Sequence, residues 1–168
     1  MQILKTMKRL TAFMLLIFVL AGCGYQNSAT QPNMLSKGFT KVSFGKVKNP
    51  TLDRWLEPAM RSQIRDEITN RGQLQWVDKA EAEALINLKI ISLEDSNGIR
   101  GDKDETLKYE ETLRVQMSIT NPTDGRTIWN SGTVEVSESY LPNNEPATQQ
   151  LVVKLMSRRL VDRLNQAY

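Results

Sequence analysis

The sequence predicts an α+β fold in which a four-stranded, mostly antiparallel sheet packs against two helices as a two-layer sandwich. Three observations support this class. Four segments alternate apolar and polar residues with the period of a strand, two segments carry apolar residues with the period of a helix, and their order is strand, helix, three strands, helix. Packing the helix stripes onto one sheet face leaves the opposite face polar.

The first 22 residues have the pattern of an export signal. Basic residues, with no acidic one, precede an apolar run from Leu10 to Ala21. At about 12 residues this run is shorter than the roughly 20 that a membrane-spanning helix needs, so we expect residues 1–22 to be a cleaved signal peptide. The end of the run, Leu20-Ala21-Gly22-Cys23, resembles the bacterial lipobox. This resemblance implies that Cys23 is lipidated and anchors the protein to a membrane.

Residues 23–36 predict a flexible tether between the lipid anchor and a single domain over residues 37–168. The tether is rich in Gln, Asn, Ser, Thr and Pro and poor in apolar residues, a composition that does not offset the entropy of ordering. Gly24 follows the cysteine, whereas Asp at that position would resemble an inner-membrane retention signal. We therefore expect the protein on the periplasmic side of the outer membrane.

The domain begins with a predicted strand and an amphipathic helix. From Phe39 to Val47 apolar and polar residues alternate, which favours a half-buried strand. Pro58 belongs in a first helical turn, so we expect the regular helix to begin near Leu56 and to end at Gly72. The apolar stripe of this segment has a period of 3.6 residues and comprises Leu52, Trp55, Leu56, Ala59, Met60, Ile64 and Ile68.

Three more strands follow, from Ala84 to Leu93, from Tyr109 to Thr120 and from Thr127 to Ser137, each with alternating apolar residues. Residues 95–106 are polar, charged and rich in Gly and Ser, which predicts a solvated loop. Residues 121–125 are Asn-Pro-Thr-Asp-Gly, a turn sequence, so the last two strands should pair as an antiparallel hairpin.

The final predicted element is a helix that runs to the C-terminus. Pro146 suits its first turn. Its apolar stripe comprises Leu151, Val152, Leu155, Met156, Leu160 and Leu164. We expect this stripe to pack on the same sheet face as the first helix.

Composition excludes several classes of function. The chain has no histidine and one cysteine, Cys23, which rules out a disulfide within the chain, a Cys-rich zinc cluster, a Cys-His pair and histidine-based catalysis. Without the signal-peptide residues Lys5, Lys8 and Arg9, basic and acidic residues balance at 19 each, so no basic field favours nucleic acid. We predict that the protein is not an enzyme and has no metal or cofactor.

The lipobox, the start Cys23-Gly24-Tyr25, the tether and the order of elements together resemble the LptE family over roughly Leu20 to Leu164. The resemblance implies a non-enzymatic outer-membrane lipoprotein. Such a protein assists assembly of the β-barrel LptD, plugs it, and takes part in transport and insertion of lipopolysaccharide. A polar sheet face is compatible with a position inside a polar barrel lumen.

Lipopolysaccharide carries phosphates and carboxylates, so its contacts should be Arg or Lys side chains on exposed loops. Arg100 and Lys103 fall in the predicted 95–106 loop, and Arg126 closes the hairpin turn at the opposite end of the intervening strand. The competing interpretation for all three is an ordinary solvated turn charge. Trp129 is a candidate partner contact, on the expectation that alternation with Ile128 places it on the polar sheet face.

An alternative function comes from a different class of lipoprotein. A small α+β domain tethered to the outer membrane also resembles LpoB, an activator of a penicillin-binding protein in cell-wall synthesis. Such an activator must cross the peptidoglycan layer, which favours a much longer tether than residues 23–36 provide.

Overall fold

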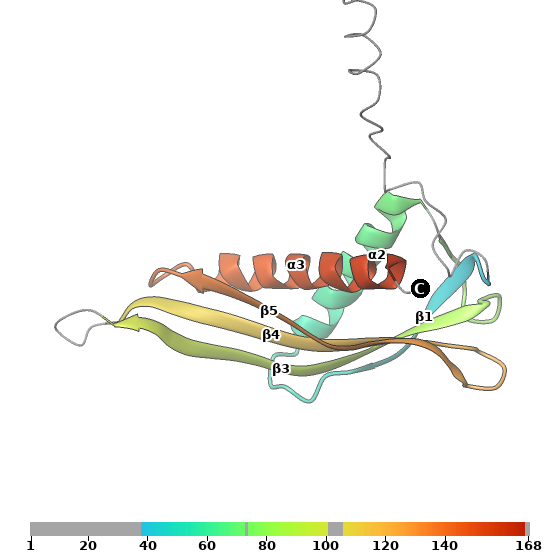
Figure 1. Cartoon of the computed structure of the whole chain (residues 1–168), viewed down its shortest axis with the longest axis horizontal. Coiled ribbons are helices and arrows are strands. Elements are labelled where there is room, and N and C mark those ends of the chain that lie inside the picture. The colour runs from blue at the N-terminus through green and yellow to red at the C-terminus, as the bar shows by residue number, and fades with distance from the viewer. Residues whose placement is uncertain (1–37, 73, 101–105, 167–168) are drawn as a thin grey trace, which may run out of the picture. The chain divides into compact units, whose positions relative to one another are not determined.

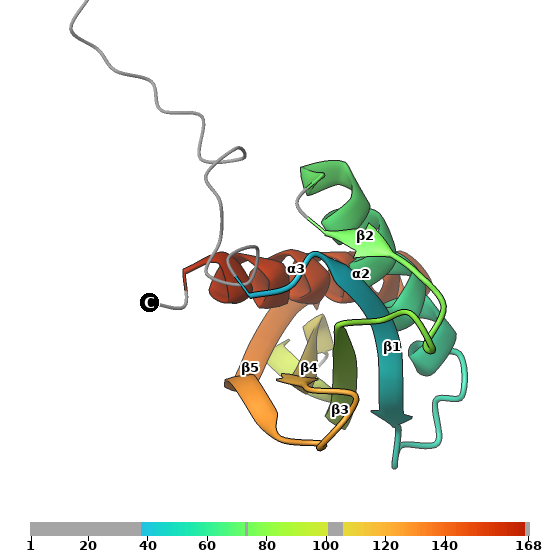
Figure 2. The same ribbon diagram turned by 90° about the vertical axis from the view of Figure 1, so that its right-hand side faces the viewer.

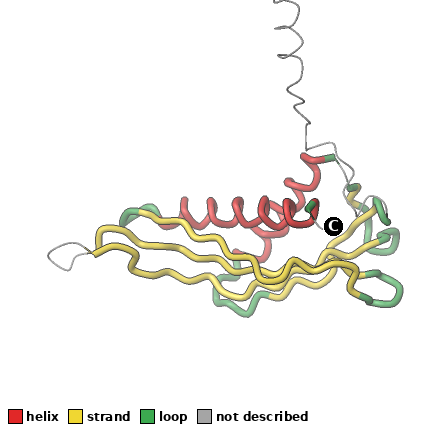
Figure 3. Tube along the Cα trace, viewed as in Figure 1, coloured by secondary structure: helices red, strands yellow, loops and turns green. Residues whose placement is uncertain are grey.

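The computed structural model describes residues 38–72, 74–100 and 106–166. These residues form two layers, a sheet and a pair of helices that both lie on one face of it (Figures 1 and 3). The strands and helices are β1 (Lys41–Lys48), α2 (Leu56–Arg71), β2 (Gln75–Trp76), β3 (Ala84–Arg100), β4 (Thr106–Thr120), β5 (Thr127–Tyr140) and α3 (Glu145–Asn165). Neither helix is long and apolar enough to cross a membrane. The signal peptide, Cys23 and the tether lie outside the described residues.

The sheet has five strands in the order β2-β1-β3-β4-β5 and is mixed, which corrects the prediction of four mostly antiparallel strands. β1 pairs in parallel with both β2 and β3, whereas β3, β4 and β5 pair antiparallel. The parallel pair follows from connectivity, because α2 carries the chain over one face between β1 and β3. β2 has only two residues and is too short to show a periodic pattern. Figure 2 shows it beside the start of β1.

The strands β3 and β4 are longer than predicted and occupy most of the expected 95–106 loop. β3 extends to Arg100, and β4 begins at Thr106. Polar residues enter the strands because the neighbouring strand satisfies their backbone groups: Asp95 pairs with Glu111 and Ser96 with Glu110. Composition alone therefore underestimated the length of this hairpin.

The core lies between the sheet and the helices. From Leu113 to Thr120 in β4 the residues of one face are buried and those of the other are half-buried, as the alternation predicted. The core residues of the helices are Leu56, Met60, Ile64, Ile68, Val152, Val153, Met156, Leu160, Val161 and Leu164. Three predicted stripe residues are exposed instead, Leu52 by 98%, Trp55 by 36% and Leu151 by 43%. Leu52 and Trp55 precede the first residue of α2, so the helical period does not place them.

Polar contacts hold α2, α3 and the sheet edge together. As predicted, α2 begins at Leu56 and Gly72 ends it in the left-handed conformation (φ 63°). Arg71 pairs with Asp162 across the two helices (Nη2 to Oδ1, 2.6 Å). β5 is an edge strand, and two arginines of α3 reach its backbone: Arg159 donates to the carbonyl of Glu135 and Arg163 to that of Ser131.

Candidate functional site

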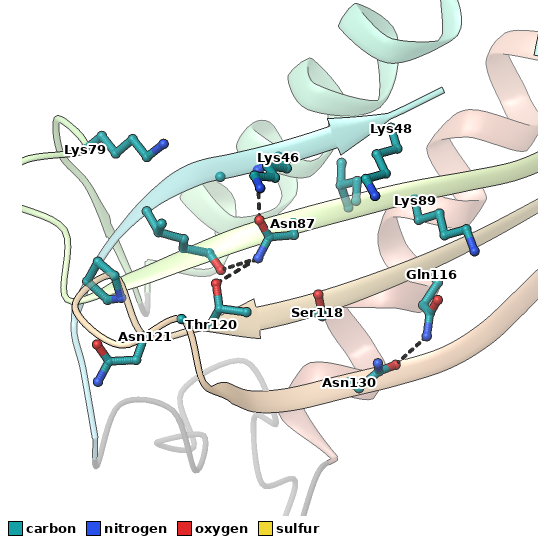
Figure 4. A pocket seen from close by; sticks show the side chains of 15 residues that line it. Lys46, Lys48, Lys79, Asn87, Lys89, Gln116, Ser118, Thr120, Asn121 and Asn130 are labelled. Atoms are coloured by element: carbon teal, nitrogen blue, oxygen red, sulfur yellow. Dashed lines mark hydrogen bonds between the residues drawn. The ribbon is translucent and has the colours of Figure 1, made fainter. Parts of the chain in front are cut away.

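The sheet face opposite the helices is polar and contains a hollow of about 450 Å³. We call this hollow the lysine groove. Figure 4 shows lysines from β1, from β3 and from the segment after β2 around it, with amide and hydroxyl side chains from β3, β4 and β5. Its lining residues are Gly45, Lys46, Lys48, Lys79, Leu85, Asn87, Leu88, Lys89, Gln116, Ser118, Thr120, Asn121, Pro122, Gly125 and Asn130.

The floor of the lysine groove is built around Asn87. Its Oδ1 accepts a hydrogen bond from the backbone N–H of Lys46 (2.8 Å), and its Nδ2 donates to Thr120 Oγ1 (2.9 Å) and, at 3.3 Å, to the carbonyl of Leu85. The β1–β3 register shifts between Phe44 and Val47, which is a bulge. Gly45 lies in this bulge, where a Cβ atom would overlap Asn87 Oδ1. One half-buried side-chain amide thus fixes three strands relative to one another (Figure 4).

The groove carries positive charge that the described part of the chain does not neutralise. All four lysines are exposed, and no acidic residue is among the described residues that line the groove. No ion pair to any of the four occurs among the described residues. Lys48 and Lys89 are register partners on neighbouring strands, so two like charges stand side by side.

Farther along the same face, the charge is neutralised. Arg114 on β4 pairs with Glu94 on β3 (Nη1 to Oε2, 2.9 Å) and with Glu135 on β5 (Nε to Oε2, 2.6 Å). A hydrogen bond from Ser92, together with a hydrogen bond from the Arg114 guanidinium and its positive charge, lowers the pKa of Glu94. The polar face therefore has a paired region around Arg114 and an unpaired region in the groove.

The structure describes the backbone at two of the three predicted lipopolysaccharide contacts, Arg100 and Arg126, which lie at opposite ends of β4. Arg100 is the last residue of β3, its side chain is not among the described ones, and Lys103 lies outside the described residues. Arg126 is exposed at the other end of β4. The carbonyl of Arg126 accepts a hydrogen bond from the N–H of Asn121 (2.9 Å), so its turn borders the lysine groove.

Trp129 corrects the expectation that it lies on the polar face. It pairs in register with Ile119 on the helix side, is half-buried and packs against the core. The register of β4 and β5 shifts between Gln116 and Ser118, at Gly132 (φ 64°), so an extra residue of β5 places Trp129 on the same face as the core residues that follow this bulge. Its neighbour Ile128 is the exposed residue of the two, at 44%. Trp129 also borders a smaller hollow of about 270 Å³ together with Arg163.

Two features of the structure were not predicted from the sequence. The groove lysines come from three separate segments, and the sequence gives only a weak signal for them: Lys46 and Lys89 each fall on the polar side of a predicted strand. The second feature is Glu111, which occupies a core-facing position of β4 and is 2% exposed. Burial, followed by the charges of Asp95 and Glu145, raises its pKa to about 7. Its Oε2 has no hydrogen-bond partner in the described structure.

The fold and the groove define a two-layer α+β domain with one polar, hollowed face. Its fold is similar to that of a minor lipoprotein from Acinetobacter baumannii, with 14% identity and a TM-score of 0.52 over 76% of this chain and 92% of that one. It is also similar to the hypothetical protein CT253 from Chlamydia trachomatis, with 12% identity and a TM-score of 0.56 over 76% of this chain and 96% of that one.

The sequence identifies the family. Residues 39–167 match LptE, the lipopolysaccharide-assembly family, and the chain belongs to that family. No curated protein matches the sequence. The family match favours lipopolysaccharide assembly over the alternative of an LpoB-like activator of cell-wall synthesis.

Proposed function

We propose that this protein is an outer-membrane lipoprotein that assists assembly of an LptD-type β-barrel, plugs it, and takes part in lipopolysaccharide transport and insertion. Membership of the LptE family over residues 39–167 is the observation that carries the proposal. In this proposal the lipid on Cys23 holds the domain at the periplasmic side of the outer membrane, and residues 23–36 give it reach.

The polar sheet face supports the role of a plug. A domain inside a barrel lumen meets polar side chains and water, so its contact surface should consist of hydrogen-bonding groups. The face opposite α2 and α3 is of this kind, because it carries Arg114, Gln116, Ser118 and Thr120 along β4. Trp129 is proposed as a partner contact at the edge of the domain, where its partly exposed ring borders a hollow.

The lipopolysaccharide contacts in this proposal are Arg100, Lys103 and Arg126. Arg100 is the last residue of β3 and Arg126 follows the turn at the other end of β4, so these two would engage separate anionic groups of a large glycolipid rather than a single phosphate. Individual substitutions to Ala should weaken lipopolysaccharide binding, because each removes a positive charge that would contact an anionic group.

The test is a mild-detergent pull-down of the tagged full-length protein from cell envelopes, with surface lipopolysaccharide measured after depletion of the protein. We expect a large β-barrel to be recovered, and surface lipopolysaccharide and folded barrel to fall on depletion. Incorporation of labelled palmitate in the wild type but not in Cys23→Ser checks the anchor. Recovery of a penicillin-binding protein instead, with surface lipopolysaccharide unchanged, would contradict the proposal.

A further inference from the structure

We propose that the lysine groove is a binding site for a phosphorylated saccharide. The inference rests on the proposed function and deepens it by adding an anion site on the polar sheet face, at the end of β4 opposite Arg100. Phosphate would contact the lysine ammonium groups, and sugar hydroxyls would contact the amide and hydroxyl side chains of β4 and the following turn.

The arrangement of charge is the first argument. Lys48 and Lys89 are register partners, and like charges that face each other across two strands repel. Lys46 lies two residues from Lys48 and lines the same groove. On the same sheet face Arg114 has two carboxylate partners, so this fold does place acids beside cations there. The described lining residues of the groove include no such acid. We therefore expect the lysines to pair with an anion from outside the described chain.

The hydrogen-bonding groups of the groove are the second argument. The Ser118 hydroxyl and the Asn121 side-chain N–H groups line the groove and have no hydrogen-bond partner in the described structure. They are available to sugar hydroxyls. No aromatic side chain is among the described lining residues, so the groove lacks the stacking surface that single-stranded nucleic acids use. A hollow of about 450 Å³ has the size of a small-molecule site.

The rigidity of the groove is the third argument. The Asn87 side chain joins β1 to β4 through Lys46 N–H and Thr120 Oγ1. The groove floor is therefore set before any ligand binds, which reduces the entropy that binding must offset. Gln116 is similarly held by a hydrogen bond from its Nε2 to Asn130 Oδ1 (3.0 Å).

The experiment compares two double variants of the full-length protein that lose the same charge. Lys48→Gln with Lys89→Gln removes the register pair, whereas Lys108→Gln with Lys154→Gln removes two exposed lysines outside the groove. The probes are trehalose 6-phosphate, trehalose, purified lipopolysaccharide before and after phosphatase treatment, and phosphatidylglycerol vesicles. Binding is measured by titration at low and high salt, and circular dichroism verifies the fold of each variant.

We expect the groove variant to bind phosphorylated probes at least about tenfold more weakly than wild type, because it lacks two ammonium groups that would donate charge-assisted hydrogen bonds to phosphate. The control variant should bind as wild type does. Removal of phosphate from the probe should have an effect similar to that of the groove substitutions. Binding should also weaken as salt rises.

The outcomes separate the sources of the ligand. Binding of trehalose 6-phosphate supports a site for the phosphosugar itself, and phosphate-dependent binding of lipopolysaccharide alone supports a glycolipid head group. Equal losses in the two double variants, equal binding of trehalose, or equal binding of phosphatidylglycerol vesicles by the Cys23→Ser chain, which has no lipid anchor of its own, would each overturn the proposal. Recovery of the barrel from envelopes by the groove variant is scored separately. If the protein recovers a barrel but does not bind phosphosugars, only the groove proposal is wrong. If it binds phosphosugars but recovers no barrel, only the proposed function is wrong.

Discussion

Unpaired charge lies near both ends of β4, but its surroundings differ at the two ends. Near its C-terminal end the lysine groove holds exposed positive charge on the polar face. Toward its N-terminal end, Glu111 is buried on the helix face, between its register partners Asp95 and Glu138. Water solvates the lysines at little free-energy cost, whereas burial penalises the Glu111 carboxylate and raises its pKa. The lysine charges are thus available to a ligand, whereas the buried Glu111 carboxylate changes the stability of the fold.

The largest effect that we expect from this contrast is the pH dependence of stability caused by Glu111. Its pKa is about 7 in the folded protein and 4.5 for the ordinary side chain. Between these values the folded state binds more protons than the unfolded state, so the free energy of unfolding should fall as pH rises. Glu111→Gln should therefore stabilise the protein by on the order of 3 kcal/mol at pH 8 and have little effect near pH 4.

Urea unfolding at several pH values measures this effect. The matched control is Glu110→Gln, because Glu110 is the neighbouring residue on the opposite face of β4. The control should keep the wild-type dependence on pH. If the free energy of unfolding of Glu111→Gln depends on pH as that of wild type does, the buried carboxylate is not the cause of the pH dependence.

The next effect concerns the floor of the groove. In Gly45→Ala the added Cβ would overlap Asn87 Oδ1 and lie 3.2 Å from Leu85 Cβ, so the β1 bulge must shift. Overpacking of this kind destabilises proteins by about 1–3 kcal/mol. We expect a lower thermal midpoint and, because Asn87 positions Lys46, weaker binding of trehalose 6-phosphate.

A double-mutant cycle with Asn87→Ala identifies the cause. Removal of the Asn87 amide group also removes the atom that the added Cβ would meet, so Gly45→Ala should be less destabilising in the Asn87→Ala background. Strictly additive effects of the two substitutions on the free energy of unfolding would mean that this contact is not responsible.

The smallest effect should come from the paired region around Arg114. Its partners Glu94 and Glu135 are about half exposed, and ion pairs in such settings contribute little to stability. Arg114→Gln should shift the thermal midpoint less than the two preceding variants, and less still at high salt. It should raise the pKa of Glu94, followed by NMR titration, because Arg114 contributes to lowering it. An unchanged Glu94 pKa would argue against the pairing.

Much of the fold follows from periodicity in the sequence, and the exceptions have physical causes. The faces of β4, the start of α2 at Leu56 and its end at Gly72 agree with the predictions because each depends on nearby residues. The direction of β1 depends instead on the path of α2, and the pairing of β2 depends on tertiary contacts, so neither has a local signal. Register shifts also change which residues of a strand face the core, as Trp129 shows.

The candidate site was harder to predict than the fold. Lys46, Lys79 and Lys89 are far apart in sequence and meet only because β1 lies beside β3 and the segment after β2 returns to the same edge. The sequence instead drew attention to charges in hairpin loops. Of these, Arg126 lies beside the groove, and the role of all three residues, Arg100, Lys103 and Arg126, in lipopolysaccharide binding remains a prediction.

The contacts of Arg159 and Arg163 with β5 have a consequence for behaviour at high concentration. An edge strand offers unoccupied carbonyls to any extended segment that passes, and such edges start aggregation. In this domain two of those carbonyls, at Ser131 and Glu135, already accept hydrogen bonds from guanidinium groups of α3. A second copy would have to displace both arginines before it could extend the sheet there. The helix therefore protects this edge and opposes strand-to-strand association between crowded copies.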